Sequence, residues 1–267
     1  MSWWGKLVGG AFGFMLGGPL GALLGAALGH NFDKGIDNLP DDGEFDPGQQ
    51  ERVQMAFFTA TFSIMGAVAK ADGQVTREEI RLAELVMQQM NLSSEMKKTA
   101  VSLFNEGKQA DFPLDEVIEQ FRFECHRRVN LMQMFVEIQL QAAYADGEMD
   151  AAERQLLQHV CKKLGFSSLL FKQLEMRIKA ERNFTGGAGQ SQQPRGPSLA
   201  DAYAVLGVSE STPDRDLKKA YRRLISQHHP DKLVAKGLPE EMMKVAADKT
   251  HEIKQAYEII KQHRQMK

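Results

Sequence analysis

The stretch LADAYAVLGVSESTPDRDLKKAYRRLISQHHPDKL, from Leu199 to Leu233, decides the fold of the C-terminal part of the chain. The apolar residues of its second half fall at the spacing of one buried helix face: Leu217, Tyr221, Leu224 and Ile225. A further helix with the same kind of spacing is expected from about Pro239 to His263. We therefore predict two antiparallel helices that pack through these faces.

The tripeptide His229-Pro230-Asp231 lies between these two helices. The motif YRRL at 221–224 precedes it, and QAYE at 255–258 follows it. With these motifs, residues 199–267 resemble the J domain of Hsp40 co-chaperones. The resemblance implies that the tripeptide and the basic face of the preceding helix dock on ATP-bound Hsp70 (DnaK) and stimulate its ATP hydrolysis. The residues that it assigns to this docking surface are His229, Pro230, Asp231, Lys218, Lys219, Arg222, Arg223 and Lys232.

Plainer interpretations of the same residues stay open. The tripeptide could be a helix-ending turn in which Asp231 is the cap, and the basic residues could be an ordinary solvated face. His228 and His229 could be a metal pair, and the basic helix could bind nucleic acid, although no base-reading motif accompanies it. The sequence shows no set of nucleophile, base and acid, and no phosphate-binding loop. We expect neither an enzyme nor a cofactor, metal or nucleic-acid partner.

The segment GGAFGFMLGGPLGALLGAALGH, from Gly9 to His30, has a glycine at every fourth position. No charged residue occurs from Leu7 to Gly29, and a helix of that length covers about 34 Å, enough for a hydrocarbon core of roughly 30 Å. We predict a transmembrane helix over 7–29, after a short exterior N-terminus over 1–6. A secretory signal peptide and a soluble hairpin broken at Pro19 are the alternatives.

Small residues four apart allow two helices to approach closely in lipid. The predicted contact of a homodimer therefore consists of Gly9, Gly13, Gly17, Gly21, Gly25 and Gly29.

Three segments are predicted between this span and the C-terminal unit. Residues 30–50 combine many acidic residues with proline and glycine, which is typical of a tether. Residues 51–183 contain little proline and show helical apolar spacing, which predicts an all-helical domain. Residues 184–198 are rich in glycine, glutamine, serine and proline, so we expect a flexible linker that makes the C-terminal unit a separate module.

The central domain contains an internal repeat. KADGQVTREE from Lys70 and YADGEMDAAE from Tyr144 agree in Ala-Asp-Gly, a helix cap and Glu. Each copy predicts a helix, a turn and a helix that starts with a capping box, formed by Thr76 with Glu79 and by Asp150 with Glu153. A metal site is the weaker alternative for the clustered acids Asp72, Glu78, Asp146, Glu148 and Asp150. The repeat resembles the TerB-like helical domain of tellurite-resistance proteins.

The composition agrees with soluble domains behind a membrane anchor. Hydrophobic residues make up 43% of the chain and the formal net charge is −2, values that do not indicate bulk nucleic-acid binding. The two cysteines form no C-x-x-C motif, which favours a reduced compartment. We predict an all-α protein with one N-terminal transmembrane helix, a TerB-like helical domain and a C-terminal J-domain hairpin.

The order of these three parts resembles bacterial inner-membrane co-chaperones of the DnaJ type. Because Hsp70 needs ATP, the resemblance implies a periplasmic N-terminus and cytoplasmic C-terminal domains. The expected partners are Hsp70, client proteins that the sequence does not identify, membrane lipid and a second copy of the chain. The alternative function is that of a membrane adaptor or signalling protein that acts through the TerB-like domain and carries a vestigial J domain.

Overall fold

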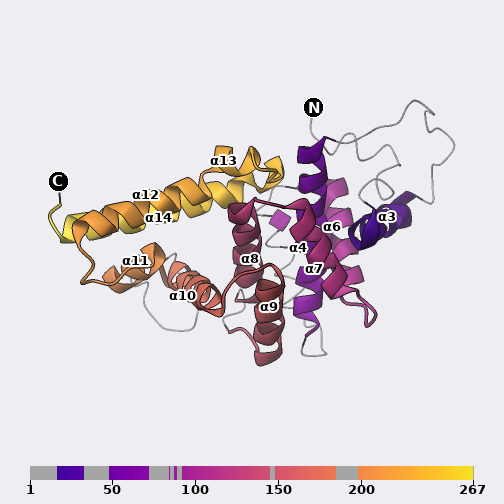
Figure 1. Cartoon of the computed structure of the whole chain (residues 1–267), viewed down its shortest axis with the longest axis horizontal. Helices are drawn as coiled ribbons and strands as arrows, with labels where there is room; N and C mark the ends of the chain where they lie inside the picture. The colour runs from indigo at the N-terminus through magenta and orange to yellow at the C-terminus, as the bar shows by residue number, and fades with distance from the viewer. Residues whose placement is uncertain are drawn as a thin grey trace.

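The computed structural model describes residues 17–32, 48–71, 84, 87–88, 92–144, 148–184 and 198–266. Within these ranges the chain forms helices and no strand, which confirms the all-α class. Figure 1 shows a bundle that contains α3 to α9 and an elongated C-terminal part that contains α11 to α14, with α10 between them. The site predicted from the sequence lies in the elongated part.

The bundle is built around α4 (Gln49–Ala69), which is buried along most of its length. The helices that pack against it include α6 (Ser94–Gly107), α7 (Leu114–Glu124), α8 (Val129–Ala143) and α9 (Ala151–Lys163). The rings of Phe57, Phe121 and Phe135 meet in the core, with centroids 4.6 to 6.2 Å apart. Among the described residues, α4 alone is long and apolar enough to cross a membrane, but its burial is that of a core helix.

α4 and α6 approach each other backbone to backbone, and this contact requires glycine. A Cβ atom at Gly107 would lie 1.8 Å from the carbonyl oxygen of Ser63, and one at Gly66 would lie 2.0 Å from that of Phe104. Because real Cβ atoms do not approach so closely, the two glycines set the distance between the helices.

The first described helix, α3 (Gly18–Phe32), begins well inside the predicted transmembrane span. Gly17 and Gly18 have φ angles of 61° and 59°, which lie outside the right-handed helical region. Pro19 then fits the first turn of α3, where its missing N–H is not needed. The continuous helix predicted over 7–29 is therefore interrupted at Gly17 and Gly18, and residues 1–16 lie outside the described part.

α3 packs on α6 and α7 and buries Leu20 and Leu24. The Gln120 side chain of α7 donates to the carbonyl oxygen of Gly17 at 2.7 Å and accepts from the N–H of Leu20 at 2.8 Å. The described members of the glycine stripe differ in environment: Gly17 is exposed, Gly21 buried and Gly25 half-buried, and Gly29 belongs to α3. Gly9 and Gly13 lie outside the described residues.

The second copy of the internal repeat forms its predicted capping box at the start of α9. The Asp150 side chain accepts from the N–H groups of Ala152 and Glu153, and the Glu153 side chain accepts from the Asp150 N–H at 2.9 Å. This reciprocal pair confirms the cap. Thr76, Glu79 and the acids Asp72, Glu78 and Asp146 fall outside the described residues, so the first cap and the metal alternative stay predictions.

The C-terminal part consists of helices on both sides of the predicted loop. In chain order they are α11 (Leu199–Leu206), α12 (Asp214–His228), α13 (Pro230–Val234), the 3-10 turn η2 (Glu240–Met242) and α14 (Met243–His263). α12 and α14 pack on each other as predicted, and α11 packs on α14. α13 is a short helix that the sequence did not predict.

The C-terminal part is docked on the bundle. α10 (Ser168–Phe184) packs against α11, and its Ala180 and Phe184 belong to the same hydrophobic cluster as residues of α12 and α14. On the other side, Leu233 and Leu238 belong to the core cluster of the bundle. The described residues of the C-terminal part thus pack on the bundle, and the flexible linker expected over 184–198 stays a prediction. Residues 185–197 lie outside the described ranges.

Candidate functional site

α12 carries the predicted basic face. Lys219, Arg222 and Arg223 are exposed and Lys218 is half-buried. The opposite face is buried at Leu217, Ala220, Leu224 and His228, which follow one another at helical spacing. Tyr221 and Ile225, predicted in the buried stripe, are half-buried at its edge, where the Tyr221 ring stacks on Tyr257 of α14 at 4.1 Å between centroids. A row of cations therefore faces solvent beside the loop.

The tripeptide His229-Pro230-Asp231 forms the junction between α12 and α13. His229 ends α12 and caps α13, because its Nδ1 accepts the N–H of Asp231 at 3.2 Å, and Pro230 occupies the first position of α13. His229, and not Asp231, is thus the cap. Since Nδ1 accepts this hydrogen bond, the neutral ring carries its proton on Nε2.

The side chains of the tripeptide remain accessible. The Asp231 side chain is 85% exposed and that of His229 is 41% exposed. Lys232 is exposed as well, and its Nζ donates to Ser226 Oγ at 2.7 Å, which ties α13 back to α12. An imidazole, a carboxylate and several cations therefore share one accessible surface, and Pro230 restricts the backbone between them.

The loop lies beside the bundle. Behind α13, Gln50 of α4 donates to the carbonyl oxygen of Val234 at 3.3 Å, and the backbone at Gly237 closely approaches Val53. His228, the residue directly before the tripeptide, is buried, and its Nδ1 lies 3.6 Å from Oε2 of Glu137 on α8. The bundle thus contacts the chain on both sides of the tripeptide.

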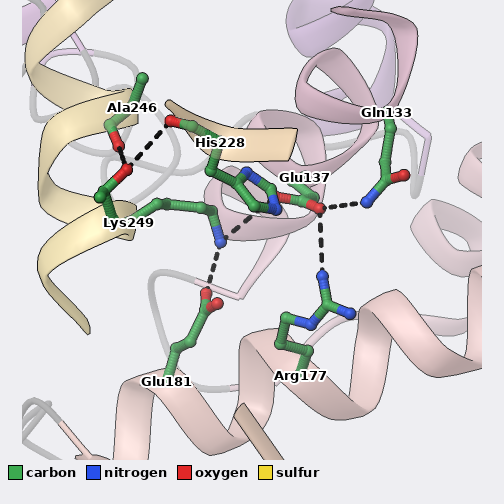
Figure 2. A network of polar contacts seen from close by, with 8 residues as sticks. Gln133, Glu137, Arg177, Glu181, His228, Ala246 and Lys249 are labelled. Carbon is green, nitrogen blue, oxygen red and sulfur yellow. Dashed lines mark hydrogen bonds and ion pairs between the residues drawn. The ribbon is translucent and has the colours of Figure 1, made fainter. Parts of the chain in front are cut away.

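A buried polar network surrounds His228 (Figure 2). We define the interdomain cluster as Glu137, Arg177, Glu181, His228 and Lys249, which come from α8, α10, α12 and α14. Lys249 Nζ lies 2.5 Å from Glu181 Oε2 and 3.5 Å from Glu137 Oε2. Glu137 Oε1 accepts from Gln133 Nε2 at 2.9 Å and lies 3.5 Å from Arg177 Nη1. Thr250, next to Lys249, donates its hydroxyl to the carbonyl oxygen of His228 at 3.0 Å.

Burial shifts the pKa values of the interdomain cluster, and the neighbouring charges oppose these shifts to different degrees. Burial alone would raise the pKa of Glu137, but His228, Lys249 and Arg177 outweigh it and lower that pKa to about 2. Burial lowers the pKa of His228 to about 4 against the attraction of Glu137, so its ring is neutral at pH 7. Burial also opposes the charge of Lys249, yet Glu181 and Glu137 hold its pKa above the usual value. Burial, and next to it the charge of Glu137, raise the pKa of Glu181 against the attraction of Lys249. Glu137 is therefore the acid of the cluster that is most firmly ionised.

This cluster was not predicted from the sequence, although one signal was present. Lys249 falls between Val245 and Ile253 on the apolar stripe of α14, at a position where a cation needs a buried partner. Glu137 lies in the same way within the apolar run of α8. His228 was weighed only as a metal ligand beside His229, and the structure places its ring in the buried cluster and the ring of His229 in a cap.

Comparison with known families finds three matching models. The co-chaperone DjlA transmembrane domain matches residues 1–42, tellurite resistance protein TerB matches residues 58–176, and the DnaJ domain matches residues 201–267. These ranges contain the glycine stripe, most of the bundle, and the helices around the tripeptide, respectively.

Full-length relatives agree with this division. The co-chaperone protein DjlA of Photobacterium profundum is 45% identical over 99% of this chain and 100% of its own length. The proteins of the same name from Coxiella burnetii and Escherichia coli K12 are 46% and 42% identical, each over 100% of both chains. No solved structure gives a significant match.

Proposed function

The chain belongs to the DjlA family of co-chaperones, and on this premise we propose that it stimulates ATP hydrolysis by a cytosolic Hsp70 through the His229-Pro230-Asp231 loop and the basic face of α12. It is a J-domain co-chaperone and not an enzyme. We propose further that it acts from the bacterial inner membrane and recruits Hsp70 to client proteins there. The region at 1–42, which matches a co-chaperone transmembrane domain, supports membrane anchoring.

The observation that carries the proposal is the accessibility of the loop in a docked domain. Although the bundle covers His228, the side chains of His229 and Asp231 and the cations Arg222 and Arg223 stay exposed. An exposed basic helix face attracts an acidic partner and speeds encounter. A loop that proline and a cap hold in place binds with little ordering cost.

His229→Gln tests the loop. We expect this variant of the full chain, in detergent micelles, to lose stimulation of Hsp70 ATP hydrolysis while its thermal melting falls only slightly, because the side chain caps α13 but contributes little to the core. His263→Gln, at an exposed histidine of α14, is the matched control and should stimulate normally. A His229→Gln variant that stimulates like the wild type would contradict the assignment.

Charge reversal tests the basic face. Arg222→Glu should slow association with Hsp70 at low salt, and the difference from the wild type should shrink at high salt, because screening limits a surface charge to a Debye length of about 8 Å at physiological ionic strength. Stopped-flow binding at several salt concentrations measures this. A defect that does not depend on salt would show that Arg222 makes a specific contact and does not steer the partner.

The proposed orientation has a separate test. We propose a periplasmic N-terminus and cytoplasmic TerB-like and J domains, because Hsp70 and its ATP are cytoplasmic. Protease added to spheroplasts should leave the J domain intact, and the same protease should degrade it in inverted membrane vesicles. Degradation in intact spheroplasts would reverse the proposed topology.

We propose that two copies pair in the membrane through the glycine stripe, Gly9 to Gly29. The supporting observations are the four-residue spacing of the glycines and the match of this region to a transmembrane domain. Gly21 is buried in the packing of α3 on the bundle, so pairing in lipid requires α3 to leave that packing. In a membrane association reporter, Gly21→Leu should weaken pairing more than Leu16→Ala. Equal effects would exclude the stripe as the interface.

A further inference from the structure

The interdomain cluster joins the bundle to the two helices that meet at the docking loop. Glu137, Arg177 and Glu181 come from α8 and α10, whereas His228 and Lys249 come from α12 and α14. A charge left without its partner in a buried site is strongly unfavourable. In the docked arrangement Lys249 Nζ lies 2.5 Å from Glu181 and 3.5 Å from Glu137 (Figure 2), so the cluster favours this arrangement over one that separates Lys249 from these acids.

The cluster reaches the loop through a short chain of contacts. Glu137 holds the ammonium group of Lys249 at 3.5 Å, and the next residue, Thr250, donates to the carbonyl oxygen of His228. The ring of His228 also packs against the Glu137 carboxylate. The backbone of His228 is therefore held by a hydrogen bond and its ring lies beside Glu137, and the next residue in the chain is His229.

We propose that Glu137 is a positioning residue for the docking loop, so that the TerB-like domain forms a supporting part of the Hsp70-docking site. Glu137 acts through Lys249 and His228 and does not touch the partner. This proposal rests on the proposed function, because the loop that it positions is the one assigned to Hsp70 docking. It makes the TerB-like domain more than a spacer between the membrane and the J domain.

The effect of removing the Glu137 charge on the half-stimulating concentration depends on the fraction of molecules whose loop is in the docking conformation. If loss of the Glu137 charge leaves about a tenth of the loops in the docking conformation, the concentration needed for half-maximal stimulation rises about tenfold. The maximal rate stays unchanged, because the residues that touch Hsp70 are intact. A general loss of fold would raise the half-stimulating concentration in the same way, so hydrogen exchange in the two cores is needed to separate unfolding from a local effect on the loop.

Glu137→Gln is the test variant because it removes the charge at nearly constant volume. Glu116→Gln, at an exposed carboxylate of α7, is the matched control. The full chain is titrated against Hsp70, and hydrogen exchange is followed in peptides that cover residues 229–234 and in peptides from the two cores. We expect a tenfold rise in the half-stimulating concentration and faster exchange at 229–234 alone, with Glu116→Gln behaving like the wild type.

A cross-link between α4 and α13 tests whether holding the loop in place rescues the Glu137→Gln variant. Gln50 and Val234 lie close together across the interface, so Gln50→Cys with Val234→Cys can be joined by a short bis-maleimide. The native thiols of Cys125 and Cys161 are buried, and burial raises the pKa of both, so they react slowly. The cross-link should restore the half-stimulating concentration of Glu137→Gln to the wild-type value.

Each outcome decides the proposal. The positioning role would be overturned if a folded Glu137→Gln variant had the wild-type half-stimulating concentration. It would also be overturned if the cross-link failed to restore that concentration in the variant. If hydrogen exchange of Glu137→Gln is fast in all peptides, the variant is unfolded, and the double variant Glu181→Leu with Lys249→Met replaces it. This double variant removes one acid and one cation together, and the same criteria apply to it. If the wild-type chain does not stimulate Hsp70, the proposed function fails, while exchange at 229–234 still reports whether Glu137 positions the loop.

Discussion

Lys249→Met removes the central cation of the interdomain cluster. The ammonium group is 2% exposed and lies 2.5 Å from Glu181 and 3.5 Å from Glu137. Without it, two buried acidic groups lose a shared cation, and Glu137 keeps Arg177 at 3.5 Å. Breaking a buried ion pair by removing one partner costs about 3 to 5 kcal/mol, so the free energy of unfolding should fall by that amount.

Lys249→Met with Glu181→Leu should recover most of this loss. The double variant removes the carboxyl closest to the lost cation, while Glu137 keeps Arg177 at 3.5 Å, and replacement of a buried pair by apolar side chains is often neutral. The two single variants should therefore be worse than the double variant, with a coupling energy of about 2 kcal/mol or more.

Urea unfolding of the full chain, followed by circular dichroism, measures both effects. At an m-value of about 2 kcal/mol per molar, a loss of 3 to 5 kcal/mol lowers the midpoint by about 1.5 to 2.5 M. Lys254→Met, at an exposed lysine of α14, is the control and should shift the midpoint little. A Lys249→Met midpoint equal to the wild type, or a double variant as unstable as Lys249→Met, would refute this account of the cluster.

Three further substitutions test the packing by thermal melting. Gly237→Ala should destabilise by about 2 kcal/mol, because φ is 97° and a Cβ would lie 2.6 Å from Val53; an unchanged melting temperature would argue against this contact. Gly107→Ala should cost about 3 kcal/mol through its clash with Ser63 on α4, whereas tolerance would contradict the close helix approach. Arg264→Met should cost about 2 kcal/mol, because its guanidinium bonds the start of α12 and two other segments; no loss would mean that water replaces these bonds.

The docking surface could be predicted because its signal is local. The tripeptide, the cations of 218–223 and the apolar face of α12 lie within a few turns of one another in sequence, so helical periodicity alone groups them. The half-burial of Tyr221 was not predicted. Ala220 lies three residues after Leu217 and Tyr221 lies four residues after it, so both fit helical spacing, and the spacing alone does not say which of the two is buried more deeply. Which face is deeper depends on the packing of α14 and α10.

The docked arrangement could not be predicted because its parts are far apart in the chain. Glu137, His228 and Lys249 each resemble an ordinary polar residue of a helix when read alone. Their pairing depends on how α8, α10, α12 and α14 pack, which no local pattern specifies. The linker composition at 184–198 did not decide between the two arrangements, since flexible segments are compatible with either a free or a docked module.

One carboxyl at the edge of the interdomain cluster remains without a cation of its own. Glu252 of α14 is half-buried, and its Oε2 has no hydrogen-bond partner among the described residues. Burial first, and then the nearby acids Glu181 and Asp248, raise its pKa to about 7 against the attraction of Lys249. Because the folded pKa exceeds the unfolded value of 4.5, the stabilising contribution is complete below pH 4.5 and is lost as pH rises through 7.

Glu252→Gln should therefore stabilise the protein at high pH and not at low pH. The glutamine imitates the protonated carboxyl, so the two proteins should unfold at similar urea concentrations near pH 4.5. Above pH 7 the buried charge destabilises the wild type, and the variant should be more stable by up to about 3 kcal/mol, because the folded pKa lies at about 7 instead of 4.5. Glu258→Gln, at an exposed position of the same helix, controls for the change in net charge. A stability difference that is the same at pH 5 and pH 8 would show that Glu252 does not titrate in this range, and the cluster would then tolerate a third carboxylate.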